Sequence, residues 1–198
     1  MEELTSALDE ARLGEENVDG RNFVTETLLY RIMSEDAIRR TLADAGVLPH
    51  DRRDLTTNIL RGARKCFAIL VSIRHPAQIS EFFKRDTLQT SYPDDRLPYN
   101  VQALEQIFGE EAGGLIVRHF LDRQWVFTVP IMHQQTLHRE LDRRVILPFL
   151  ERKHVGEGAK GVAWKVRVHE DCHRLPLKDH HTVRLSTLAS LFTCSTFY

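Results

Sequence analysis

The sequence predicts a mostly α-helical protein with a small antiparallel β-hairpin or sheet at its C-terminal end, which is an α+β fold. Two observations support this prediction. Between residues 34 and 125, apolar side chains recur at helical spacing in several segments, two of which open with a capping residue. In residues 162–168, "VAWKVRV", apolar and polar side chains alternate as in a half-exposed strand, directly after a glycine-rich stretch. We therefore expect a helical region over residues 1–145 and a β segment that begins near Ile146.

The first helices are indicated by their ends and by their apolar spacing. A helix is expected up to Gly46, with Ser34 as its N-cap and two acidic residues in its first turn. A second helix is expected over residues 55–73, "LTTNILRGARKCFAILVSI", because its apolar positions recur at intervals of three and four. The charged stretch "LPHDRRD" before it is expected to be a linker.

The second half of the helical region contains one more long helix and a candidate strand. Residues 100–124 begin with Asn100 as a candidate cap, and the pair of glycines at 113–114 predicts a break. The following segment "WVFTVPI", from Trp125, is rich in β-branched and aromatic residues and predicts a strand.

The charge and hydropathy of the chain exclude several partners. A formal net charge of −1 provides no basic field for nucleic acid, so we expect no nucleic-acid partner. No apolar run reaches the roughly 20 residues that span a bilayer, so no membrane partner is expected. The acidic start "MEELTSALDEARLGEE" lacks the pattern of a secretory signal, and we expect an intracellular protein, cytoplasmic or nuclear.

Cysteines and histidines gather near the C-terminal end, but their spacing fits no standard zinc motif. We therefore expect His169, Cys172, His173, His180 and His181 to be ordinary loop residues and expect no metal site. The cysteines are widely separated, which is typical of free thiols in a reducing compartment.

The stretch "HVGEGAKGVAWKV", residues 154–166, contains Gly156, Gly158 and Gly161 at the spacing G-x-G-x-x-G. A P-loop would require lysine and serine or threonine after the last glycine, and valine and alanine stand there. A Rossmann turn would require a buried strand before the glycines and a helix after them, whereas a charged segment precedes and an alternating strand follows. The remaining interpretation is a glycine turn between two antiparallel strands.

With this turn, "ILPFLERKHVGEGAKGVAWKVRVH" resembles the opening of a eukaryotic protein-kinase domain. The upstream stretches "KCFAILVSI", "DDRLPY" and "QWVFTVPI" resemble the helical N-terminal region of kinase-like proteins of filamentous fungi. The resemblance implies an incomplete kinase N-lobe that starts in residues 146–181, with ATP and magnesium as cofactors. It also implies that the full-length protein transfers phosphate to serine or threonine of a protein substrate.

The resemblance implies a cofactor site in which the glycine backbones face the phosphates and an apolar residue contacts adenine. The residues that fall on these positions are Val155, Gly156, Gly158, Gly161, Ala163 and Lys178. Ala163 stands where the family usually has valine. The phosphate-binding lysine of the third strand has two alternatives: Lys178 in "LPLK", or a strand "TVRLS" that places Ser186 at the lysine position.

No residue is assigned to catalysis, because no catalytic-loop aspartate or D-F-G motif follows the glycines. Residues 182–198 change abruptly in composition and do not resemble kinase sequence, so we expect this chain to be truncated and inactive, and expect the encoding transcript to carry the missing motifs. The alternative function is a non-enzymatic helical module that binds another protein. The sequence specifies neither the substrate, nor the partner, nor the oligomeric state.

Overall fold

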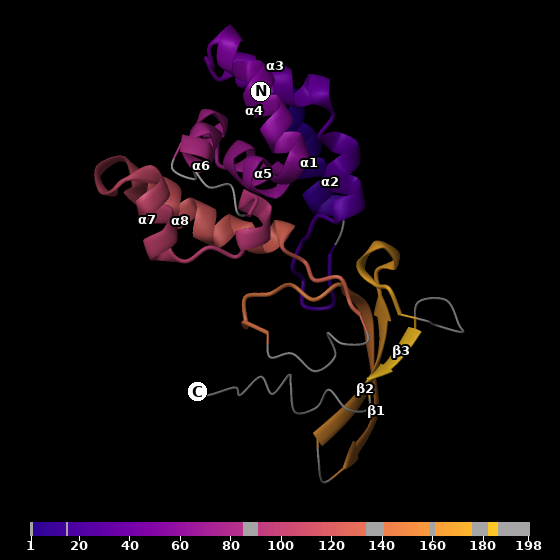
Figure 1. Ribbon diagram of the computed structural model, residues 1–198. Coiled ribbons are helices and arrows are strands. Elements are labelled where there is room, and N and C mark those ends of the chain that lie inside the picture. Colours follow the sequence, from indigo (N-terminus) through magenta and orange to yellow (C-terminus); the bar gives the residue numbers. More distant parts are fainter. Residues whose placement is uncertain are drawn as a thin grey trace.

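The computed structural model describes residues 2–14, 16–84, 91–133, 141–158, 161–175 and 182–185. Helices dominate, and an antiparallel sheet follows them at the C-terminal end (Figure 1). The predicted fold class, mostly α with a small C-terminal antiparallel sheet, is therefore confirmed. The helices of the described residues are α1 (Glu2–Gly14), α2 (Glu26–Ile32), α3 (Glu35–Asp44), α4 (Pro49–Gly62), α5 (Arg64–Ser72), α6 (Glu81–Lys84), α7 (Val101–Phe108) and α8 (Glu110–Phe127). Short 3-10 turns are η1 (Pro76–Ser80), η2 (Pro93–Arg96) and η4 (Glu170–Cys172).

The centre of the helical part is α5, which contacts α1, α2, α4 and α8. Its residues from Cys66 to Val71 are all fully buried. A helix that is apolar on every side has no solvent face to offer, so it becomes the core around which amphipathic helices pack. None of the described helices is long and apolar enough to cross a membrane.

The predicted helix caps are confirmed. The Ser34 hydroxyl accepts a hydrogen bond from the Ala37 N–H at the start of α3, and the Asn100 side chain accepts one from the Ala103 N–H at the start of α7. Gly46 follows α3 with a φ of +79°, a backbone conformation that glycine adopts without strain.

The single helix expected over residues 55–73 is wrong, because two helices, α4 and α5, cover it. The break at Ala63 has two causes in a distant segment. The Tyr92 ring lies against Gly62, and the Asp94 carboxylate accepts hydrogen bonds from the N–H groups of Lys65 and Cys66, both 2.9 Å long. The expected linker "LPHDRRD" is also wrong, because it forms the start of α4, with Pro49 in the first turn.

Gly62→Ala is expected to destabilise the protein, although alanine is the better helix former. A Cβ atom at this position would lie 2.3 Å from Cγ and 2.4 Å from Cβ of Tyr92. Overpacking of this kind costs about 1–3 kcal/mol of unfolding free energy. Gly114→Ala in α8 is the matched control, since a Cβ there meets no atom within 4 Å, and it should stabilise by about 0.5–1 kcal/mol. Chemical denaturation of both variants tests this difference in sign.

The break expected at residues 113–114 and the strand expected from Trp125 are both wrong. The chain turns instead at Gly109, whose φ is +82°, and α8 continues through the glycine pair to Phe127. Phe120, Gln124 and Phe127 are buried at helical spacing, so the buried face of α8 extends into the segment that looked like a strand. Burial of this face outweighs the β propensity of the same residues.

The sheet consists of β1 (Phe149–Gly158), β2 (Gly161–Val168) and β3 (Thr182–Leu185), antiparallel and in the order β1-β2-β3. The predicted hairpin over residues 149–155 and 162–168 is confirmed by the β1–β2 register. The boundary drawn between residues 181 and 182 falls at the start of β3, so the sheet extends into the segment with the changed composition.

The loop between α1 and α2 joins the helices to the sheet, and Figure 1 shows it reaching from the helices toward β1. The Val18 N–H donates to the Phe149 carbonyl at 2.8 Å, and the Thr25 hydroxyl donates to Asp171 at 3.1 Å. A second buried cluster lies at this junction and contains Phe23, Trp125, Ile146 and Cys172. The sheet is therefore docked on the N-terminal residues of the chain.

Candidate nucleotide site at the glycine turn

The three glycines lie at the turn of the β1–β2 hairpin. Gly158 pairs with Gly161 across the turn, and the two residues between them lie outside the described residues. The register shifts between His154 and Gly156, so Val155 is the extra residue of a β-bulge. The bulge increases the local twist of β1 directly before the glycines.

One face of the hairpin is covered. Phe149, Val166 and Val168 are buried against Met132, and Trp164 is half-buried on the same face. Towards the turn, Arg152 stacks over the Trp164 ring at 5.0 Å, and His154 meets the same ring edge-on. The alternation in the sequence predicted this face correctly, because successive side chains of a strand point to opposite faces of the sheet.

The other face is open near the glycines. Val155 is 54% exposed, and Ala163 is half-buried opposite Gly156. A Cβ atom at Gly156 would meet nothing within 4 Å, and Gly156 does not have a positive φ. The protein's own packing therefore does not require glycine at this position, and space remains over the backbone for a bound group.

The charges on the open face are mainly positive. Lys153 and Lys165 are exposed and directly opposed in the register, while Glu151 and Arg167 form an ion pair at 2.8 Å. Two like charges at opposed positions disfavour pairing unless an anion lies near them. The sequence analysis missed this lysine pair, since only the register of β1 against β2 brings the two side chains together.

The third strand is formed by Thr182–Leu185, in which Val183 pairs with Val166 and Leu185 with Trp164. This is the segment of the second alignment, which puts Ser186 at the lysine position of the kinase family. Ser186 and Lys178 both lie outside the described residues. The structure thus brings five of the six candidate residues together in one hairpin and leaves Lys178 unplaced.

The histidine and cysteine cluster has packing roles where it is described. His169 Nδ1 accepts a hydrogen bond from the Asp171 N–H, and the His169 ring lies edge-on to Phe23. Cys172 is a buried free thiol at the junction with the helices. Within the described ranges, no group of three or more potential ligands is placed to hold a metal ion.

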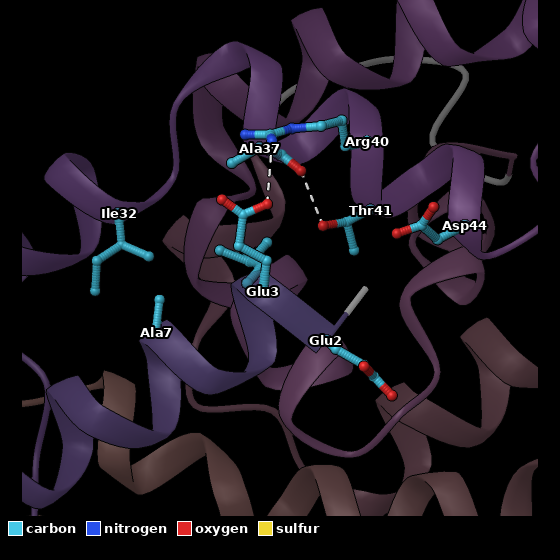
Figure 2. Close-up of a pocket in the computed structure, with 9 residues that line it drawn as sticks. Glu2, Glu3, Ala7, Ile32, Ala37, Arg40, Thr41 and Asp44 are labelled. Carbon is cyan, nitrogen blue, oxygen red and sulfur yellow. Dashed lines mark hydrogen bonds and ion pairs between the residues drawn. The ribbon is translucent and has the colours of Figure 1, made fainter.

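A hollow of about 560 Å³ lies in the helical part, between α1 and α3 (Figure 2). Glu3 pairs with Arg40 across it at 3.0 Å, and the Thr41 hydroxyl donates to the Ala37 carbonyl at 2.8 Å. These polar groups are already satisfied within the chain, and the hollow is remote in sequence from the glycine turn.

Comparisons of this chain with models of protein families, with curated proteins and with solved structures found no match. The geometry of the hairpin is therefore the basis for any function assigned to it.

Proposed function

We propose that this chain is the N-terminal part of a serine/threonine protein kinase-like protein, in which a helical module precedes the first strands of an ATP-binding lobe. The observation that supports the proposal is the antiparallel hairpin in which Gly158 and Gly161 flank the turn, followed by a third antiparallel strand. Glycines at such a turn let backbone N–H groups approach phosphate oxygens closely. The open space over Gly156 and the positive charge of Lys153 and Lys165 are compatible with a phosphate-bearing ligand.

The same residues imply weak binding by this chain. In the family, a third-strand lysine, magnesium-binding side chains and a hinge contact the nucleotide together with the glycine loop. In this chain, the described residues that could contact a nucleotide are those of the glycine hairpin and its lysine pair, Lys153 and Lys165. Ordering a loop on binding costs about 1–2 kcal/mol per residue fixed, which a few backbone contacts offset poorly.

We expect Mg-ATP to bind this chain with a dissociation constant of about 1 mM or weaker, which corresponds to only about 4 kcal/mol. Amide shifts in a titration with Mg-ATP should centre on β1 and β2 near Val155 and Ala163, without saturation below millimolar concentration. Gly158→Val is expected to change this weak binding little.

Two outcomes would contradict this expectation. Shifts that avoid the hairpin, or no nucleotide effect at high Mg-ATP, would count against the nucleotide-site proposal. Micromolar binding that Gly158→Val abolishes would show that the hairpin is a competent site in this chain alone.

A second candidate function is a helical module that binds another protein. A groove along α4 with an exposed leucine at one end favours it, and a nucleotide-independent thermal shift on addition of a partner would support it. The two functions are compatible, since the groove and the glycine turn belong to different parts of the fold.

A further inference from the structure

One face of α4 borders two adjoining hollows. The larger, about 490 Å³, lies between α4, the turn after α3 and the η1–α6 segment, and the smaller, about 30 Å³, lies between α4, α6 and η2. Asn58 and Phe83 line both hollows, so the two form one continuous groove. This α4 groove is lined by Leu48, Asp51, Asp54, Asn58, Phe83 and Tyr92.

The length of the groove follows from the helix that forms its wall. Positions 51, 54, 58 and 61 recur at intervals of three and four, which places them on one side of α4. The 14 residues of α4 extend for about 21 Å at 1.5 Å per residue. A helix of about four turns would match this wall, and α6 provides part of a second helical wall along the groove.

Apolar side chains are exposed at both ends of the groove. Leu48, directly before α4, is 57% exposed. Tyr92, which lies against Gly62 at the end of α4, is 44% exposed. Between them, Leu55 and the half-buried Phe83 form an apolar floor. Asn58 is also half-buried and makes no hydrogen bond with the described part of the chain. A helix-in-groove interaction uses anchors of this kind, spaced over two to three turns.

The Leu48 half of the groove is acidic. Asp51 and Asp54 are exposed along its rim. Asp51 lies 3.3 Å from the His50 ring, and Asp54 has no ion pair among the described residues. Two basic residues also line the groove: Lys84 is paired with Glu81 at 2.6 Å, and Arg61 lines the smaller hollow at the Tyr92 end. A partner that buries apolar side chains on Leu48 therefore meets the negative charge of Asp51 and Asp54 beside them.

We propose that the α4 groove binds an amphipathic helix of a partner protein, with its apolar stripe on Leu48 and Phe83 and with basic side chains facing Asp51 and Asp54. This inference rests on the second candidate function and is independent of the nucleotide proposal. Charge complementarity selects a basic partner helix, and the helical walls of the groove select a helix over an extended strand.

The test uses two synthetic helical peptides of about 14 residues, the length of α4. Both carry leucine at i, i+3, i+4 and i+7, and the remaining positions are lysine in one peptide and glutamate in the other. In a titration followed by amide shifts, we expect the lysine peptide to bind, with its largest shifts at Leu48, Asn58 and Phe83, and the glutamate peptide to bind at least tenfold more weakly.

Matched variants locate the interaction. Leu48→Ser should weaken binding of the lysine peptide roughly tenfold, because it removes most of one buried leucine from the interface. Leu115→Ser, at a leucine that is 60% exposed on α8, should leave the affinity unchanged. The double variant Asp51→Lys, Asp54→Lys should reverse the preference between the peptides. Far-ultraviolet circular dichroism checks that each variant keeps its helices.

The outcomes separate the groove from the wider function. Equal binding of both peptides, or binding that Leu48→Ser leaves unchanged, overturns the proposed groove. Shifts at another helical surface also overturn the groove but support a helical interaction module. Binding of neither peptide at about millimolar concentration counts against both.

Discussion

Replacing Asp94 with alanine is expected to lower the free energy of unfolding by about 2–3 kcal/mol. The Asp94 carboxylate accepts two backbone hydrogen bonds at the start of α5, and α5 is the central helix of the fold. Loss of a helix cap costs about 0.5–2 kcal/mol, and buried N–H groups left without an acceptor add to this cost. Urea denaturation of the wild type and the variant measures the difference.

Asp122→Ala is the control for this prediction, because Asp122 is an exposed carboxylate on α8 and should change stability by no more than about 0.5 kcal/mol. Asp94→Asn keeps one acceptor and should cost less than Asp94→Ala. If Asp94→Ala and Asp122→Ala have equal effects, the capping role of Asp94 is wrong.

The pH dependence of the Asp94 effect has a definite sign. Burial raises the pKa of the Asp94 carboxyl above its ordinary value, and the N–H groups of Cys66 and Lys65 offset this only in part. The folded protein therefore holds this proton more tightly than the unfolded chain, and the wild type loses stability as the pH rises through the raised pKa. Relative to Asp94→Asn, the wild type should gain stability as the pH is lowered from neutral toward about 4.

Phe23→Ala is expected to lower the free energy of unfolding by about 3–5 kcal/mol, the range for removing a large buried aromatic side chain. Phe23 is completely buried in the cluster that joins the helices to the sheet, with Trp125, Ile146 and Cys172. Because this cluster contacts both parts, its loss should loosen the sheet more than the helices. Hydrogen exchange of β1 and β2 amides should therefore accelerate more than that of α5 amides.

Phe120→Ala is the matched variant, since Phe120 is equally buried but packs with Phe82 and Tyr99 inside the helical core. It should lower the free energy of unfolding by a similar amount, without accelerating hydrogen exchange in the strands more than in the helices. If both variants loosen the sheet and the helices in the same proportion, the junction does not act as a separate contact between them.

Local signals predicted the hairpin and the helix caps. Alternation in residues 162–168 gave the two faces of β2, because a strand that is covered on one side needs apolar residues at every second position. Ser34 and Asn100 were found because a cap depends only on N–H groups two or three residues away.

The errors arose where distant residues decide the structure. The break between α4 and α5 depends on Tyr92 and Asp94, about thirty residues downstream in the chain. The end of α8 at Phe127 depends on the burial of Phe120 and Gln124, whereas the local composition favours a strand. At the candidate site, the glycine turn was predictable, but the opposed lysines Lys153 and Lys165 required the register of two strands.

The docking of β1 on the loop after α1 has a consequence for the order of folding. The hydrogen bond from Val18 to Phe149 joins residues that are separated by most of the chain, and the bond from Asn17 to Leu147 spans 130 positions. During synthesis the N-terminal loop cannot form these hydrogen bonds until the strands have been made. Helices such as α3 and α4 can pack against each other earlier, because they are adjacent in the sequence. In pulse-labelled refolding, we therefore expect amide protection in α3 and α4 to appear before protection in β1.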